Sequence, residues 1–160
     1  MPIVPLADLE TCLKARHRLL GLDVGTKTIG LALSDALGTA ATPLDTIRRA
    51  KFARDAQTLA QLFETRDVCG LVIGLPLGMD GTEGPRCQSV RQFAANLLAV
   101  VDRPTAFWDE RLSTAAVTRV MIEADLSRKR RAELVDKAAA AYILQGALEH
   151  LRGLRATPAG

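Results

Sequence analysis

The chain has 160 residues, the length of one domain that can bury a core without disulfide or metal support. Hydrophobic residues make up 48% of it and charged residues 24%, a composition that argues against a mainly disordered chain. The net charge of +3 is compatible with an anionic partner, and no run approaches the roughly 20 uninterrupted apolar residues of a membrane span.

The first part of the chain has the pattern of an antiparallel meander. An apolar run over 18–23 ends at an acid, and the following residues form a turn in which Gly25 can adopt a positive φ. Residues 28–34 are the returning strand, and residues 42–47 form a third strand with Pro43 near its start.

After residue 50 the pattern changes to alternating helices and strands. Helices are expected over 52–63, 90–101, 117–124 and 134–151, and buried strands over 68–74 and 104–108. Ser113 or Thr114 is a candidate N-cap for the third helix. Because strands joined by helices pair in parallel through right-handed crossovers, the sequence predicts an α/β fold. Its mixed five-stranded sheet has three antiparallel strands, then parallel βα units, and helices on both faces.

We expect a single domain over residues 1–160, with loosely ordered ends at 1–15 and 153–160. The N-terminus lacks the basic and apolar regions of a secretory signal, which favours a cytoplasmic location. The cysteines, at positions 12, 69 and 87, are odd in number and lack CxxC spacing. This predicts free packing thiols in a reducing cytosol and disfavours a disulfide framework or a zinc site.

Acids stand at three informative places. Asp23 ends the first strand, Asp109 and Glu110 end the last strand, and Asp136 lies on the buried stripe of the final helix, near its first turn. Each has an ordinary explanation as a turn residue, a helix cap or a complement to the helix dipole. Together they converge where open α/β sheets place their sites, at the carboxyl ends of the strands.

Clustered carboxylates repel one another unless a cation neutralises them. A set of oxygen ligands without histidine or cysteine selects Mg²⁺ or Mn²⁺. Two such ions catalyse the hydrolysis of phosphodiester bonds, so the acids favour a metal-dependent nuclease.

Glycines and basic residues supply candidate phosphate contacts. The loop after the fourth strand contains Gly74, Pro76 and Gly81, and it either cradles a phosphate or connects flexibly. The densest basic run, over 127–131, is predicted in a loop before the final helix, where it contacts a nucleic-acid backbone or is simply solvated. A second basic group extends this surface and comprises Arg48, Arg49, Lys51 and Arg54.

Four segments resemble, in order, the motifs of the YqgF family, also called RuvX. They are Gly21–Asp35, Gly74–Gly81 with Gly84, Asp109–Thr114, and Asp136–Ala140 with Ile143–Gln145. The resemblance spans residues 21–145 and implies a ribonuclease H-like fold. It also implies a bacterial nuclease of the cytoplasm that matures the 5′ end of pre-16S rRNA, a family earlier described as resolving Holliday junctions.

The resemblance assigns catalysis and metal binding to Asp23, to Asp136 and to a middle acid, either Asp109 or Glu110, of which we prefer Glu110. Expected nucleic-acid contacts are Lys27, Arg111, Ser113, Thr114, Arg128, Lys129, Arg130 and Arg131, with Gly25 in the loop near the site. The expected cofactors are two Mg²⁺ or Mn²⁺ ions. The expected partners are an rRNA precursor, branched DNA or a ribosomal particle, with no membrane partner, and the chain acts as a monomer or homodimer.

Two other functions compete with the nuclease. Asp23–Thr26 also resembles the phosphate loop of sugar kinases and actin-like ATPases, but those proteins need two such halves. A non-catalytic nucleic-acid-binding module would carry the same acids as structural residues.

Overall fold

A computed structural model describes residues 3–112 and 128–156, and within the last helix the side chains of residues 137–154. One five-stranded sheet forms the centre, with the strand order β3-β2-β1-β4-β5. The strands are β1 (Arg18–Val24), β2 (Thr28–Ser34), β3 (Ala41–Arg48), β4 (Val68–Leu75) and β5 (Thr105–Asp109). Antiparallel pairs join β1 to β2 and β2 to β3, and parallel pairs join β1 to β4 and β4 to β5. The predicted mixed sheet is therefore confirmed.

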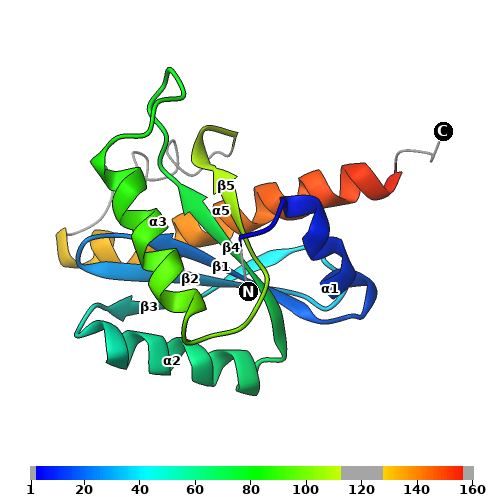
Figure 1. Ribbon diagram of the computed structural model, residues 1–160, viewed down its shortest axis with the longest axis horizontal. Coiled ribbons are helices and arrows are strands. Elements are labelled where there is room, and N and C mark those ends of the chain that lie inside the picture. The colour runs from blue at the N-terminus through cyan, green and yellow to red at the C-terminus, as the bar shows by residue number, and fades with distance from the viewer. Residues whose placement is uncertain (1–2, 113–127, 157–160) are drawn as a thin grey trace.

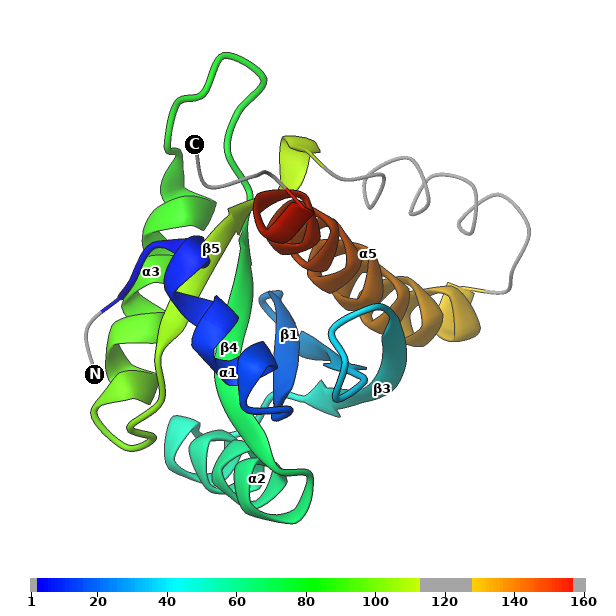
Figure 2. The ribbon, with the colours of Figure 1, turned by 90° about the vertical axis from the view of Figure 1, so that its right-hand side faces the viewer.

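Helices cover both faces of the sheet (Figures 1 and 2). On one face lie α2 (Phe52–Thr65) and α3 (Pro85–Leu98), which connect β3 to β4 and β4 to β5. On the other lie α5 (Arg128–Ala156) and the short α1 (Glu10–Lys14), which follows the 3₁₀ turn η1 (Leu6–Leu9). No helix in the described part of the chain is both long and apolar enough to span a membrane.

The alternation of side chains along each strand divides the core into two clusters. Leu20 and Leu22 of β1 belong to the cluster under α2 and α3, whereas Leu19 packs in the cluster under α5. The predicted buried stripe of α5 is confirmed, since Ala139, Ala140, Ile143, Ala147 and Leu151 are all buried.

Helix α5 lies directly against the backbone of β1. Gly21 is buried, and a Cβ atom added there would lie 2.8 Å from Leu144 Cβ and 3.1 Å from the Ala140 carbonyl oxygen. Only a residue without a side chain allows the helix and the strand to approach this closely.

The N-terminal segment differs from the sequence prediction of a loosely ordered end over 1–15. Ile3 bridges to Thr105 of β5, the Val4 N–H donates to the Thr105 carbonyl oxygen, and Leu9 and Leu13 are buried beside α5. The physical reason is that this segment covers apolar surface that α5 leaves open. At the other end α5 continues through Ala156, and residues 157–160 lie outside the described chain.

The prediction of free cysteines is wrong for two of the three. Cys12 of α1 and Cys69 of β4 form a disulfide with a Cα–Cα separation of 5.6 Å. The fold brings together residues 57 positions apart, which no local spacing rule detects. Cys87 is free and buried, as predicted.

The turn after β1 also differs from expectation. Among the described glycines, positive φ values occur at Gly38 and Gly81, not at Gly25. The Gly25 N–H instead donates to the Thr28 carbonyl oxygen, and a Cβ atom on Gly25 would lie 3.0 Å from that oxygen. Glycine is needed here for close approach of the backbone.

We predict that Gly21→Ala lowers the free energy of unfolding by about 1–3 kcal/mol, because the added methyl group meets the backbone of α5. Urea denaturation followed by circular dichroism measures the change. The matched control is Gly153→Ala in α5, where an added Cβ atom meets no described atom outside the backbone of the helix itself within 4 Å, and there stability should stay equal or rise. Equal stability of the two variants would contradict the close packing of α5 on β1.

Candidate active site

The carboxyl ends of β1, β4 and β5 lie side by side, as the sequence predicted. β4 lies between β1 and β5, with Leu22 of β1 paired to Ile73 and Trp108 of β5 paired to Gly74. Asp23 is therefore separated from Asp109 and Glu110 by one strand, β4. The acids of the first and third motifs share the carboxyl-end edge of the sheet.

Asp23 is a buried carboxylate, with only 4% of its surface exposed. It lies two residues after Gly21, whose missing side chain faces α5, and alternation along β1 places Asp23 on that same face. A carboxylate in this position is costly unless a charge or hydrogen bonds compensate it. Asp23 does take part in a polar interaction within the protein.

Glu110 lies in η2 (Glu110–Leu112), directly after β5, and its side chain reaches back over β4. A Cβ atom on Gly74 would lie 2.7 Å from Glu110 Oε1 and 2.5 Å from Ile143 Cδ1 of α5. The space left by Gly74 thus accommodates the Glu110 carboxylate, between the end of β4 and α5. Asp23 and Glu110 consequently occupy the α5 side of two adjacent strand ends.

Asp109 has a different partner. Both of its carboxylate oxygens accept hydrogen bonds from the Arg111 guanidinium, the shortest being 2.7 Å from Arg111 Nη2 to Asp109 Oδ2. These bonds outweigh the opposing effect of burial and lower the pKa of Asp109, and they raise the pKa of Arg111. The geometry therefore distinguishes the two neighbouring acids, because Arg111 engages Asp109 while the Glu110 carboxylate lies over Gly74 of β4.

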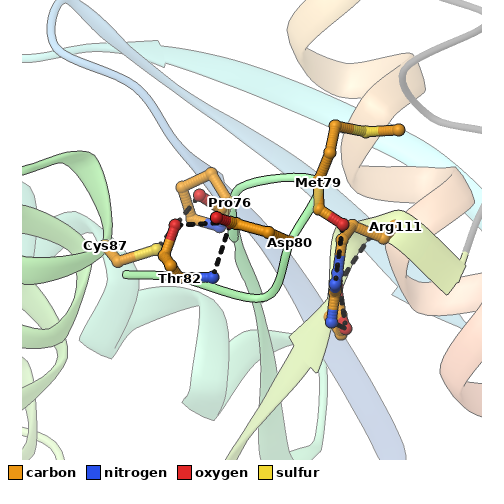
Figure 3. Close-up of polar contacts among 7 residues, drawn as sticks. Pro76, Met79, Asp80, Thr82, Cys87 and Arg111 are labelled. Carbon is orange, nitrogen blue, oxygen red and sulfur yellow. Dashed lines mark hydrogen bonds and ion pairs between the residues drawn. The ribbon is translucent and has the colours of Figure 1, made fainter. Parts of the chain in front are cut away.

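The glycine-containing loop after β4 is folded rather than loose (Figure 3). Arg111 Nη1 donates to the Met79 carbonyl oxygen, and the Gly78 N–H donates to the Thr82 carbonyl oxygen. Asp80 accepts hydrogen bonds from the hydroxyl and the N–H of Thr82, which lower its pKa. Gly81 has a φ of +86°, and its Cα faces the Arg111 guanidinium.

The base of the same loop is held by the Cys87 thiol, which donates to the Pro76 carbonyl oxygen at 3.0 Å (Figure 3). Sequence reasoning treated Arg111 as a nucleic-acid contact and did not foresee that it joins Asp109 to Met79. The Asp–Glu–Arg order was the available signal, since an acid and an arginine two residues apart can pair in a tight turn.

Helix α5 carries the remaining candidate acid. The helix begins at Arg128, so Asp136 lies well inside it and not near its first turn as predicted. The basic run over 128–131 forms the first turn of α5, which corrects the prediction of a loop. The side chains of Arg128, Lys129, Arg130, Arg131 and Asp136 lie outside the described residues, as do Ser113, Thr114 and the helix predicted over 117–124.

Lys27 is exposed in the turn between β1 and β2, beside the end of β1 that carries Asp23. Within the side chains that the structure describes, no group of three histidine, cysteine or acidic residues is close enough to hold a metal ion.

Comparison with known proteins bears on this site. Residues 17–150 match the RuvX family, described as "Holliday junction resolvase". A protein of Paramagnetospirillum magneticum named "Putative pre-16S rRNA nuclease" is 63% identical over 153 residues, covering 96% of this chain and 99% of the relative. A protein of Methylocella silvestris with the same name is 57% identical over 154 residues, covering 96% of each chain.

Solved structures agree on the fold. RuvC of T. thermophilus, in complex with a Holliday junction substrate, is similar with a TM-score of 0.54 at 12% identity, covering 86% of this chain and 96% of RuvC. The yeast mitochondrial Holliday junction resolvase Ydc2 is similar with a TM-score of 0.50 at 12% identity, covering 96% of this chain and 85% of Ydc2. At this identity the similarity concerns the fold alone, and it agrees with the predicted ribonuclease H-like sheet.

We predict that Gly74→Ala and Glu110→Ala are energetically coupled. The Cβ atom added by Gly74→Ala meets the Glu110 carboxylate, and truncation of Glu110 removes that clash. A double-mutant cycle on unfolding free energies should show a coupling of about 0.5–3 kcal/mol. The same cycle with Asp109→Ala serves as the control and should be additive, since Asp109 faces Arg111. Additivity in both cycles would contradict the placement of Glu110 over Gly74.

We also predict that Arg111→Gln raises the pKa of Asp109 toward its ordinary value of 3.8. Because the pKa of Asp109 is lowered in the folded state, the pair stabilises the protein above the unfolded-state pKa and loses this effect as pH falls through the folded-state pKa. Arg111→Gln should therefore show a weaker loss of stability in acid than the wild type. Carboxyl NMR titration measures the pKa directly. Arg91→Gln, which breaks the ion pair with Glu83, should leave the pKa of Asp109 unchanged.

Proposed function

Because this chain belongs to the RuvX family, we propose that it is a divalent-metal-dependent nuclease that processes the 5′ end of precursor 16S rRNA. The observation that carries the proposal is that the buried Asp23 and the Glu110 carboxylate lie on the α5 side of the adjacent ends of β1 and β4. Relatives with 55–63% identity that are named as pre-16S rRNA nucleases support the choice of substrate.

The residues present fit a hard divalent cation. The candidate donors are carboxylate oxygens, which Mg²⁺ and Mn²⁺ prefer, and Gly74 leaves the space in which the Glu110 carboxylate lies. We propose that Asp23, Glu110 and Asp136 hold the metal, and that two ions bind. When bound, such ions neutralise charge on the scissile phosphate and polarise it for attack by water.

The other roles that the reaction needs are assigned to residues of the chain itself. Asp23, buried on the α5 side of β1, is proposed to present its carboxylate oxygens to the cation. The Asp109–Arg111 pair joins the turn after β5 to the loop over 76–84. Lys27, in the turn after Asp23, and the basic residues in the first turn of α5 are proposed to contact the phosphate backbone.

A second candidate function is resolution of branched DNA. The description of the matched family favours it, as does the Holliday junction bound by the similar RuvC. Both functions would use the same carboxylate site and the same phosphodiester hydrolysis, so only the identity of the substrate distinguishes them.

We predict that Asp23→Asn and Glu110→Gln each reduce Mn²⁺- or Mg²⁺-dependent cleavage by about 100-fold or more, because a lost metal ligand removes several kcal/mol of transition-state stabilisation. The matched control is Asp109→Asn, which removes a carboxylate of the same edge and should retain most activity. The assay offers a precursor rRNA 5′ segment beside a four-way DNA junction.

Cleavage of the RNA that is lost in Asp23→Asn supports rRNA processing, whereas symmetric cleavage of the junction alone supports the resolvase. Undiminished cleavage by the Asp23→Asn protein, with its fold intact by circular dichroism, would refute the site. A wild-type protein that binds either substrate without cutting it would favour the non-catalytic module.

A further inference from the structure

Two adjoining cavities open along the edge strand β3, and Arg48 lines both. The first, of about 230 Å³, is lined by Thr28, Asp45, Thr46, Arg48 and Lys137, between β2, β3 and α5. The second, of about 380 Å³, lies where β3 turns into α2, and Arg49, Arg54 and Asp55 are among its lining residues. β3 is one of the two edge strands of the sheet (Figure 1), so both cavities lie along this edge of the sheet.

Three cations in these cavities are available to a ligand. In the described part of the chain, no hydrogen bond or ion pair engages the charged ends of Arg48, Arg54 and Lys137. Arg48 and Arg54 are exposed, and Lys137 is half-buried.

The neighbouring charges are already engaged. Arg49 Nη1 donates to the Gly25 carbonyl oxygen, and its guanidinium lies 5.3 Å from the centre of the Phe93 ring. Asp55 is only 2% exposed, and both of its carboxylate oxygens accept the Ala50 N–H. Asp45 Oδ1 accepts the Thr46 N–H. The two cavities together are lined by four cationic side chains and two acidic ones, so their net charge is positive, which favours an anionic ligand.

The cations begin next to the candidate active site and lead away from it. Arg48 pairs with Thr28 across the β2–β3 ladder, and two residues further along β2 Gly30 pairs with Asp23. Lys137 directly follows Asp136 in α5. The sequence of positions from the acids outward is Lys137, then Arg48, then Arg54 at the start of α2.

We propose that this edge is a binding path for a single strand of nucleic acid, with Lys137, Arg48 and Arg54 contacting successive phosphates as the strand leaves the acid site. The proposal rests on the nuclease function proposed above and specifies how its substrate is held. Single-stranded substrate follows from the shape, because small cavities that turn around a sheet edge suit a flexible backbone better than a rigid duplex. Neither cavity is lined by an aromatic residue, so bases do not stack here and binding is independent of sequence.

The test measures binding without cleavage. Fluorescence anisotropy in EDTA follows a labelled RNA of about 20 nucleotides across a salt series, with the wild type, Arg48→Gln, Arg54→Gln, Lys137→Gln and a Arg48→Gln/Arg54→Gln double variant. Each lost phosphate contact should lower the slope of log K against log salt by about 0.7, with affinity falling equally for two unrelated sequences. A blunt duplex of the same sequence should lose less affinity than the single strand.

Arg66→Gln is the matched control, because Arg66 is an exposed arginine at the far end of the same helix α2. Unchanged binding by the double variant, an equal loss in Arg66→Gln, or an equal loss for the duplex would overturn the path. These outcomes are separable from failure of the nuclease assignment, which is judged by cleavage in Asp23→Asn. A double variant that binds and cleaves as the wild type does would remove the path and leave the nuclease standing.

Discussion

The arrangement of the molecule depends on the close approach of α5 to the sheet. Three contacts on this face need glycine: Gly21 against Leu144, Gly74 against Ile143, and Gly146 of α5 against the Trp108 ring. In each, a Cβ atom would lie 2.9 Å or less from its neighbour. The glycines come from β1, β4 and α5, so the helix is seated at several points along its length. These contacts hold α5, which carries Asp136, over the ends of β1 and β4. Asp23 lies at the end of β1, and the Glu110 carboxylate lies over the end of β4.

The close packing of α5 on the sheet also has an electrostatic consequence for the candidate site. A helix this close to the sheet excludes water, and a buried carboxylate such as Asp23 is then costly without a compensating charge. Arg111 does not provide that charge, because Asp109 already engages its guanidinium and Met79 accepts from it. The pairing holds the Asp109 carboxylate on Arg111, whereas the Glu110 carboxylate lies over Gly74. A divalent cation bound beside these carboxylates would supply positive charge, and their oxygen atoms are the donors that such a cation prefers.

Sequence reasoning succeeded where a local period carried the information. The five strands, the helices before and after β4, and the buried stripe of α5 all follow from alternation or from helical spacing. It preferred Glu110 to Asp109 through the family resemblance and not from the residues themselves, since adjacent residues differ only in which side of the turn they reach.

The errors of the sequence-based predictions arose where no local period carried the information. The Cys12–Cys69 disulfide and the packing of the N-terminal segment join residues far apart in sequence. The basic run before Asp136 looked like a loop because charge, and not period, dominates its composition, yet it is the first turn of α5. Gly25 has the composition of a turn with positive φ, but the backbone there needs space and not a left-handed conformation.

The distribution of arginines shows why a net charge of only +3 is compatible with binding a polyanion. Several guanidinium groups are committed within the fold, each stacked on an aromatic ring or paired with an acid: Arg49, Arg91, Arg103 and Arg111. Each of these also has a hydrogen-bond acceptor in the protein, which fixes its direction. Arg48 and Arg54 sit among them in sequence, yet they have neither an aromatic ring nor an acceptor in the described residues. Affinity for a phosphate backbone depends on such uncommitted cations near the site and not on the overall charge, because exposed charges farther than about 10 Å apart are screened at physiological salt.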